Sequence, residues 1–167
     1  MHASPEPIVP FTPFHFGPGL FLKAAAPSGV SLAAFAATQV AVDLEPLYYI
    51  LRGEYPVHRA LHTVWGGATV GIAVGLALWA LARGRAPGLP PSARGDLRRT
   101  SALLGGLIGG VSHALLDGLM HRDVHALRPV AETQWVLGPG GVAALHVSCV
   151  IAGVLGAVMM LARRGRA

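Results

Sequence analysis

Four long apolar stretches constrain the fold of this chain more than any other feature. They cover residues 31–51, 62–82, 100–121 and 141–162, so each has about 21 or 22 residues. As an α-helix each would reach ~31–33 Å, which is enough to cross the hydrocarbon core of a bilayer. The alternative, four buried helices of a soluble bundle, is disfavoured because the stretches lack the polar stripe that soluble helices carry.

The composition points the same way. Hydrophobic residues make up 53% of the 167-residue chain and charged residues only 13%, about half the charged share of a soluble domain. A disordered protein would be poor in apolar residues. One cysteine excludes an intramolecular disulfide framework. We predict a single all-α integral membrane domain (1–167) with four transmembrane helices. Residues 1–30 would add an N-terminal segment with a short re-entrant or interfacial helix.

The arginines predict the orientation of these helices. Eight of the 13 basic residues lie in the loop 83–99 or in the C-terminal tail, two segments separated by an even number of stretches. By the positive-inside rule both face the cytoplasm. The Ala/Gly/Arg-rich composition is typical of bacterial proteins, which predicts a bacterial inner membrane. No nucleic-acid-binding motif accompanies the basic residues, so no nucleic acid is expected as a partner.

Ionisable residues inside the apolar stretches are costly and need a reason. At ~1.5 Å per helical residue, such groups from all four stretches fall in one layer toward the outer end. Those that predict a site are Asp43, His58, His62, His113 and Asp117. A purely structural hydrogen-bond network is the alternative for this layer, and His146 could be either a ligand or an interhelical hydrogen-bond partner.

Spacing adds information about which residues face each other. His113, Asp117 and His121 recur every four residues and form a stripe on one helix face. His58 and His62 share a face if their helix begins early enough. Asp43 and Glu45 are two residues apart, and the following Pro46 predicts an unwound segment that turns both carboxylates inward. Histidine and carboxylate together suit Zn²⁺, Mn²⁺ or Fe²⁺.

Four short motifs carry a resemblance to a known family. They are Thr12-Pro13-Phe14-His15, Asp43-Leu44-Glu45, His58-Arg59-Ala60-Leu61-His62-Thr63 and Ser112-His113-Ala114-Leu115-Leu116-Asp117. In these residues the chain resembles the inner-membrane-associated, LexA-binding family of metal-dependent hydrolases. The resemblance implies a small helical membrane hydrolase in which His15 joins the metal ligands. Residue 15 would then lie on the outer side, and residues 16–26 would dip into the membrane and return.

The leading hypothesis is therefore a membrane-embedded metal-dependent hydrolase that acts on a lipid or lipid-linked ester or phosphoester from the outer leaflet. A divalent metal, Zn²⁺ first and Mn²⁺ or Fe²⁺ next, would activate a water, and Glu45 or Asp117 would accept its proton. Arg59 and Arg122 would hold an anionic headgroup. The expected metal ligands are His15, Asp43, His58, His62, His113 and Asp117, with room for two closely spaced ions.

Two other functional classes compete with this hypothesis. A metal-ion or proton transporter would need access from both faces, which the apolar inner half of the stretches disfavours. A non-catalytic subunit of a larger membrane complex would use the polar layer only to hold helices together. Glycines repeat every four residues at Gly67, Gly71 and Gly75, which predicts close helix packing and allows a homodimer through one such face.

Overall fold

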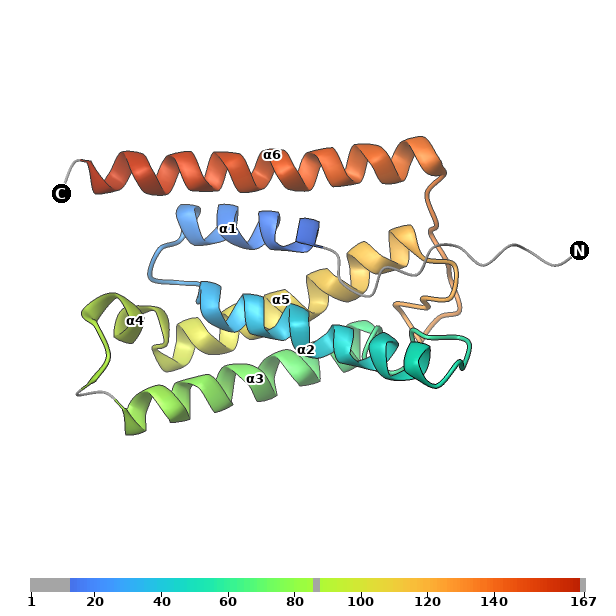
Figure 1. Cartoon of the computed structure of the whole chain (residues 1–167), viewed down its shortest axis with the longest axis horizontal. Coiled ribbons are helices and arrows are strands. Elements are labelled where there is room, and N and C mark those ends of the chain that lie inside the picture. The colour runs from blue at the N-terminus through green and yellow to red at the C-terminus, as the bar shows by residue number, and fades with distance from the viewer. Residues whose placement is uncertain (1–12, 86–87, 166–167) are drawn as a thin grey trace, which may run out of the picture.

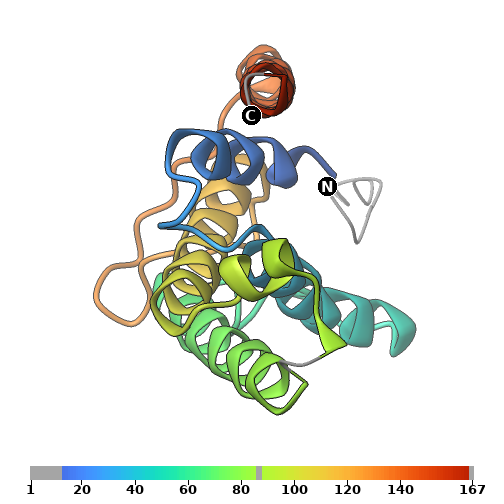
Figure 2. The ribbon, with the colours of Figure 1, turned by 90° about the vertical axis from the view of Figure 1, so that its left-hand side faces the viewer.

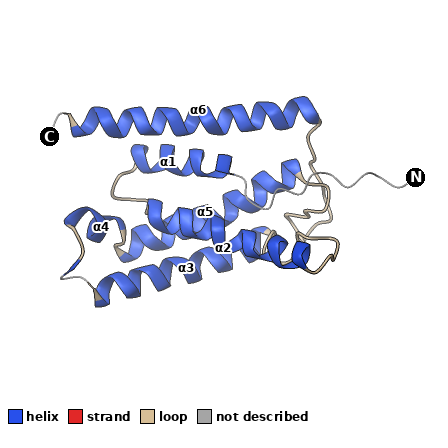
Figure 3. Cartoon of the chain, viewed as in Figure 1, coloured by secondary structure: helices blue, strands red, loops and turns tan. Residues whose placement is uncertain are grey.

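The computed structural model describes residues 13–85 and 88–165. Among these residues there are helices and connecting loops and no strand, which confirms the all-α prediction (Figure 3). The described part excludes residues 1–12, residues 86–87 of the loop 83–99, and residues 166–167. Thr12 of the first short motif is therefore outside it. The elements are a 3-10 helix η1 (Pro13–His15), α1 (Phe16–Ala25), α2 (Leu32–Leu51), α3 (Val64–Gly84), α4 (Pro91–Asp96), α5 (Arg99–Met120) and α6 (Pro139–Arg164).

Three of the described helices are long and apolar enough to cross a membrane. These are α3, α5 and α6, with 21, 22 and 26 residues, or ~31–39 Å of helix. Helix α2 has 20 residues but is not in this group, because Thr38, Gln39, Asp43 and Glu45 interrupt its apolar sequence. The three apolar helices indicate a membrane protein, and they begin and end within two residues of the predicted stretches.

Helices α2, α3 and α5 pack together as a bundle, and α1 lies between that bundle and α6 (Figure 1). The end-on view in Figure 2 places α6 on the far side of α1, away from α3. Only Cys149 and Gly156 of α6 are buried. One side of α6 packs on α1, and the apolar side chains on its other side, from Val147 to Leu161, are exposed, as expected for a helix that faces lipid.

Glycine allows α3 and α5 to approach at backbone contact. A Cβ atom placed on Gly67, Gly71 or Gly75 would collide with the carbonyl groups of Gly110, Gly106 and Ala102, respectively. The glycine repeat is therefore used within one chain, where it brings the backbones together as small residues do in lipid. The close contact fixes α5 beside the loop that precedes α3.

Helix α3 ends and helix α5 begins at one end of the molecule, where α4 and the C-terminus of α6 also lie (Figure 1). We call it the arginine end, because it holds Arg83, Arg85, Arg94, Arg98, Arg99, Arg163 and Arg164. Here Lys23 of α1 forms an ion pair with Asp96 of α4, with Nζ and Oδ1 2.6 Å apart. Asp96 also accepts hydrogen bonds from Ser31 Oγ and from the backbone amides of Leu32 and Ala33. It therefore caps the N-terminus of α2, where an anion is favoured.

One local prediction is wrong, and the condition for a shared helix face of His58 and His62 is not met. Helix α2 does not unwind at Pro46 but continues to Leu51; a proline inside a helix removes one hydrogen bond, and here the Pro46 ring is buried. Helix α3 does not begin early enough to include His58 and His62. It begins at Val64, because Thr63 accepts a hydrogen bond from the Gly66 amide at 3.0 Å and acts as its N-cap.

Candidate metal centre

Helix α5 supplies the base of the site through the predicted His113, Asp117, His121 stripe. Nε2 of His113 lies 3.1 Å from Oδ2 of Asp117, and Nε2 of His121 lies 4.0 Å from Oδ1 of the same carboxylate. His113 and Asp117 share one face of α5 because they are four residues apart, and His121 follows directly after Met120 as the C-cap of the helix. Asp117 thus lies between His113 of α5 and the C-cap residue His121.

Helix α2 and the loop before α3 complete the arrangement. Oδ1 of Asp43 lies 3.1 Å from Nε2 of His113 and 4.0 Å from Nε2 of His62. Nε2 of His62 also lies 3.3 Å from Oδ2 of Asp117. Asp43, His62, His113 and Asp117 each offer one ligand atom within 4.8 Å of the others, and all four residues are buried. We call this set the inner site.

The Nδ1 atoms of His62 and His113 each lie within hydrogen-bond distance of an acceptor. Nδ1 of His62 lies 3.0 Å from Oε2 of Glu45. Nδ1 of His113 lies 2.5 Å from Oε1 of Gln39, whose amide in turn donates to the Gly109 carbonyl at 3.2 Å. An acceptor on one ring nitrogen fixes the tautomer and leaves the other nitrogen as a lone-pair donor, which is how metal-ligating histidines are oriented.

A third histidine is held in the same way. Nδ1 of His58 lies 2.9 Å from Oδ1 of Asp123, and Oδ2 of Asp123 accepts the backbone amides of Val57 and His58. Burial raises the pKa of Asp123, but the hydrogen bonds from His58 and Val57 and the charge of His58 lower it more, to about 2. Asp123 therefore stays ionised and keeps the ring of His58 in place.

Several buried atoms at the centre have no hydrogen-bond partner in the described residues. They are both ring nitrogens of His15, Nε2 of His62 and of His113, and Oδ1 of Asp117. These four residues are at most 3% exposed, and a buried polar atom without a partner is costly. Converging nitrogen and oxygen lone pairs of this kind fit a divalent cation, so the residues present are suited to the expected metal.

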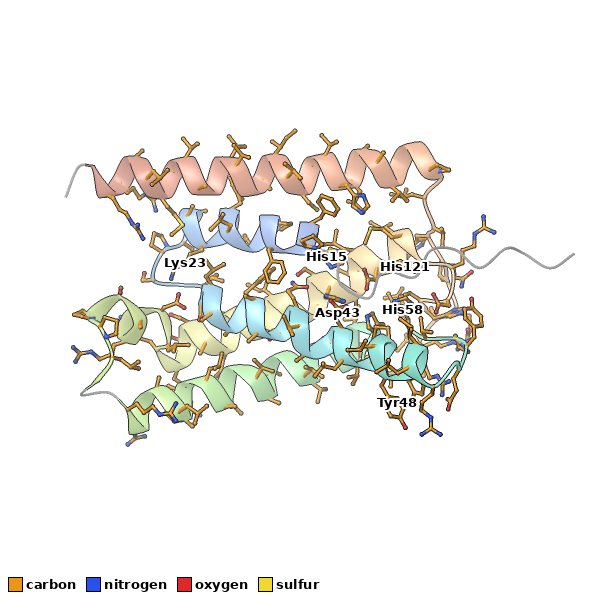
Figure 4. The ribbon with its side chains drawn as sticks, viewed as in Figure 1. His15, Lys23, Asp43, Tyr48, His58 and His121 are labelled. Carbon is orange, nitrogen blue, oxygen red and sulfur yellow. The ribbon has the colours of Figure 1, made fainter. Side chains whose placement is uncertain are left out.

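The structure brings most of the predicted site residues together. Figure 4 shows the labelled side chains His15, Asp43, His58 and His121 grouped in one region, away from Lys23 and between the middle of the molecule and the end near Tyr48. His15 joins through Nε2, 3.4 Å from Oδ1 of Asp117. His146 does not join; its ring stacks on Phe14 and Nε2 lies 3.1 Å from the Met120 sulfur.

The two predicted substrate-binding arginines lie outside the centre, on a cavity of about 990 Å³ beside it. Arg59 is fixed there, with its guanidinium 3.5 Å from the centre of the Tyr49 ring and Nη2 3.1 Å from Glu54. Within the described residues Arg122 forms no ion pair. The lining residues are Tyr55, Pro56, His58, Arg59, Ala60, Thr63, Trp65, Arg122, Asp123, His125, Arg128 and Pro129.

Sequence reasoning did not assign roles to Gln39 and Asp123. Gln39 precedes Asp43 by four residues and so lies on the same face of α2; that spacing is the signal that could have identified it. Asp123 has no such signal, because its contact with His58 depends on how two loops meet.

The chain matches no family model, no curated protein sequence and no solved structure.

Proposed function

We propose that this chain is a membrane-embedded metal-dependent hydrolase whose inner site holds a divalent cation. One observation carries the proposal: His62 and His113 each bind an acceptor through Nδ1 and direct a buried, unpaired Nε2 toward Asp43 and Asp117. A network that served only to join helices would leave few such atoms unpaired.

The donor atoms favour particular metals. Two imidazoles and two carboxylates are typical of Zn²⁺, and also suit Mn²⁺ and Fe²⁺. The single cysteine, Cys149, is on α6, and it is not a member of the inner site. We therefore propose Zn²⁺ as the first candidate.

The protein groups divide into holding and positioning roles. A cation in this site would act as a Lewis acid that activates water. Asp43, His62, His113 and Asp117 would hold it. Both oxygens of Glu45 already accept hydrogen bonds, from the amides of Arg59 and Leu61 and from the His62 ring, which favours a positioning role for Glu45 over proton acceptance. Oδ1 of Asp117 is a fully buried carboxylate oxygen without a hydrogen bond, which favours Asp117 over Glu45 as the proton acceptor.

The location of the cavity supports the substrate class. Helix α5 begins at the arginine end, and its site residues lie near its other end. With the arginine end in the cytoplasm, and with α2 counted as a fourth span, the site faces the outer leaflet of a bacterial inner membrane. The cavity beside the inner site is lined in part by Arg59, Arg122 and Arg128. Guanidinium groups bind phosphate and carboxylate oxygens well, so we propose a lipid or lipid-linked ester or phosphoester as the substrate.

Metal analysis of the full chain purified in detergent tests the proposal. We expect bound Zn²⁺ in the unmutated protein and its loss from His62→Ala and His113→Ala. His146→Ala is the matched control, because its ring meets Met120 rather than a carboxylate. A second arm measures hydrolysis of phospholipid and lipid-ester substrates by the metal-loaded protein. Absence of metal from the unmutated protein after incubation with Zn²⁺, Mn²⁺ or Fe²⁺ would contradict the proposal.

A further inference from the structure

The carboxylate of Asp117 faces histidines on both of its oxygens. Oδ2 lies 3.3 Å from Nε2 of His62 and 3.1 Å from Nε2 of His113. Oδ1 lies 3.4 Å from Nε2 of His15 and 4.0 Å from Nε2 of His121. The inner site accounts for Oδ2 but leaves Oδ1 unused, although Oδ1 is buried and has no hydrogen bond.

A second group of ligand atoms lies on the Oδ1 side. His58, Asp117 and His121 each offer one ligand atom, and these atoms lie within 4.8 Å of one another. The His58 and His121 rings stack, with centroids 4.7 Å apart and planes 26° apart. Because Asp123 binds Nδ1 of His58, Nε2 is the His58 nitrogen that remains for a cation.

We propose that His58, His121 and Oδ1 of Asp117 form a second divalent-cation position, so that Asp117 bridges two ions. This inference rests on the proposed function, since it presupposes a cation in the inner site. His121 thereby becomes a metal ligand, a role that its sequence spacing alone did not give it. The His15 ring, edge-on to His113 with centroids 4.8 Å apart, closes the same side of Asp117.

The second position, which we call the outer site, is more open than the inner one. The side chains of His58 and His121 are 10% and 33% exposed, against 1% for His62 and His113. His58 also lines the cavity that carries the arginines. The outer site is therefore the one that a substrate in this cavity meets first, and its cation should be the first to leave.

The arrangement also accounts for the charge at the centre. Asp43 and Asp117 are buried beside four histidines, and unpaired buried charge is strongly unfavourable. One cation on Oδ2 leaves Oδ1 of Asp117 and Nε2 of His15 without partners. A second cation supplies a partner for Oδ1, and a carboxylate shared between two ions is a feature of two-metal hydrolytic sites.

Metal stoichiometry tests the outer site. The full chain in detergent is loaded with Mn²⁺, freed of excess ion and analysed for metal per chain. We expect two ions in the unmutated protein and one in His58→Ala and in His121→Ala. His125→Ala, four residues further along the same loop and outside both sites, is the matched control and should keep two. Graded chelation should remove one ion before the other.

The electron paramagnetic resonance spectrum gives a readout that needs no variant. Two Mn²⁺ ions joined by a carboxylate give the spectrum of a coupled pair, whereas one ion gives that of isolated Mn²⁺. An isolated signal at one ion per chain would overturn the outer site and leave the proposed function standing. Two ions retained in His121→Ala would overturn the assignment of His121. No bound ion at all would contradict the proposed function itself, and with it this inference.

Discussion

The half-buried ionic cluster at the arginine end and the buried metal centre differ in how their polar atoms are satisfied. At the arginine end, both oxygens of Asp96 are fully used by Lys23, Ser31 and two backbone amides. At the metal centre, Asp117 meets four histidines yet keeps an oxygen without a hydrogen bond. In the first cluster every carboxylate oxygen has a hydrogen-bond partner within the protein, which stabilises the fold. In the second, buried atoms gain partners only when a ligand such as a cation binds.

The two clusters also differ in burial: the side chains of Lys23 and Asp96 are 14% and 17% exposed, whereas that of Asp117 is 4% exposed. The Lys23–Asp96 cluster and the metal centre therefore have different roles. The Lys23–Asp96 pair joins the end of α1 to α4 beside the N-terminus of α2. The metal centre instead contributes buried atoms that have no hydrogen-bond partner.

The largest expected effect comes from Asp117→Asn. An amide is a far poorer metal ligand than a carboxylate, and Asp117 belongs to both sites, so we expect loss of both ions. In the metal-free protein the same change removes a buried charge and should not lower the free energy of unfolding. Metal per chain and thermal unfolding with and without chelator check this. If the metal-free Asp117→Asn protein were much less stable than the metal-free wild type, Asp117 would stabilise the fold as Asp96 does, and the contrast between the two clusters would be wrong.

Asp96→Ala should have the opposite effects, lowering the stability of the fold without removing metal. It leaves Lys23 and the N-terminus of α2 without their partner, so we expect the free energy of unfolding to fall by about 1–2 kcal/mol, with metal per chain unchanged at low temperature. Ser28→Ala, a change in the same turn that keeps the Ser28 carbonyl as an acceptor for Ser101, serves as the control. Loss of metal without loss of stability would be the contrary result.

Smaller effects are expected from the groups that orient the histidines. Glu45→Gln and Gln39→Ala keep every ligand but loosen the rings of His62 and His113, and losses of about 10–100-fold in metal affinity are typical of such changes. Competition with a fluorescent chelator measures the affinity. Thr63→Ser, which preserves the α3 N-cap, should bind metal as the unmutated chain does. Unchanged affinity in both orienting variants would show that the rings are held by packing alone.

The smallest effect concerns pH at the arginine end. Burial raises the pKa of Asp96, but hydrogen bonds from Lys23, Ala33 and Ser31 lower it more, so its pKa lies below the usual 3.8. A carboxyl group with a lowered folded-state pKa stabilises the fold above its unfolded pKa, and this stabilisation is lost as pH falls through the folded value. Chemical unfolding from pH 6 to pH 3 should show this decline in the unmutated protein and a shallower one in Asp96→Asn.

The sequence predicted the parts of the molecule that follow from regular spacing. Apolar runs gave the positions of α3, α5 and α6, and the four-residue repeat placed His113 and Asp117 on one face. It did not predict the loop geometry, because His62 reaches Asp117 from a non-helical segment whose path depends on Thr63 and Glu45. The same limit applies to Asp123, whose contact with His58 joins residues 65 apart in the chain.

The most direct test of the account is an anomalous difference map from crystals of the full chain grown with Zn²⁺ and measured at the zinc edge. We predict a peak between Nε2 of His62, Nε2 of His113 and the carboxylates of Asp43 and Asp117, at about 2.0–2.2 Å from the nitrogen and oxygen ligands. A map without density at this position, with these side chains ordered as described, would contradict the claim that their unpaired atoms are metal ligands.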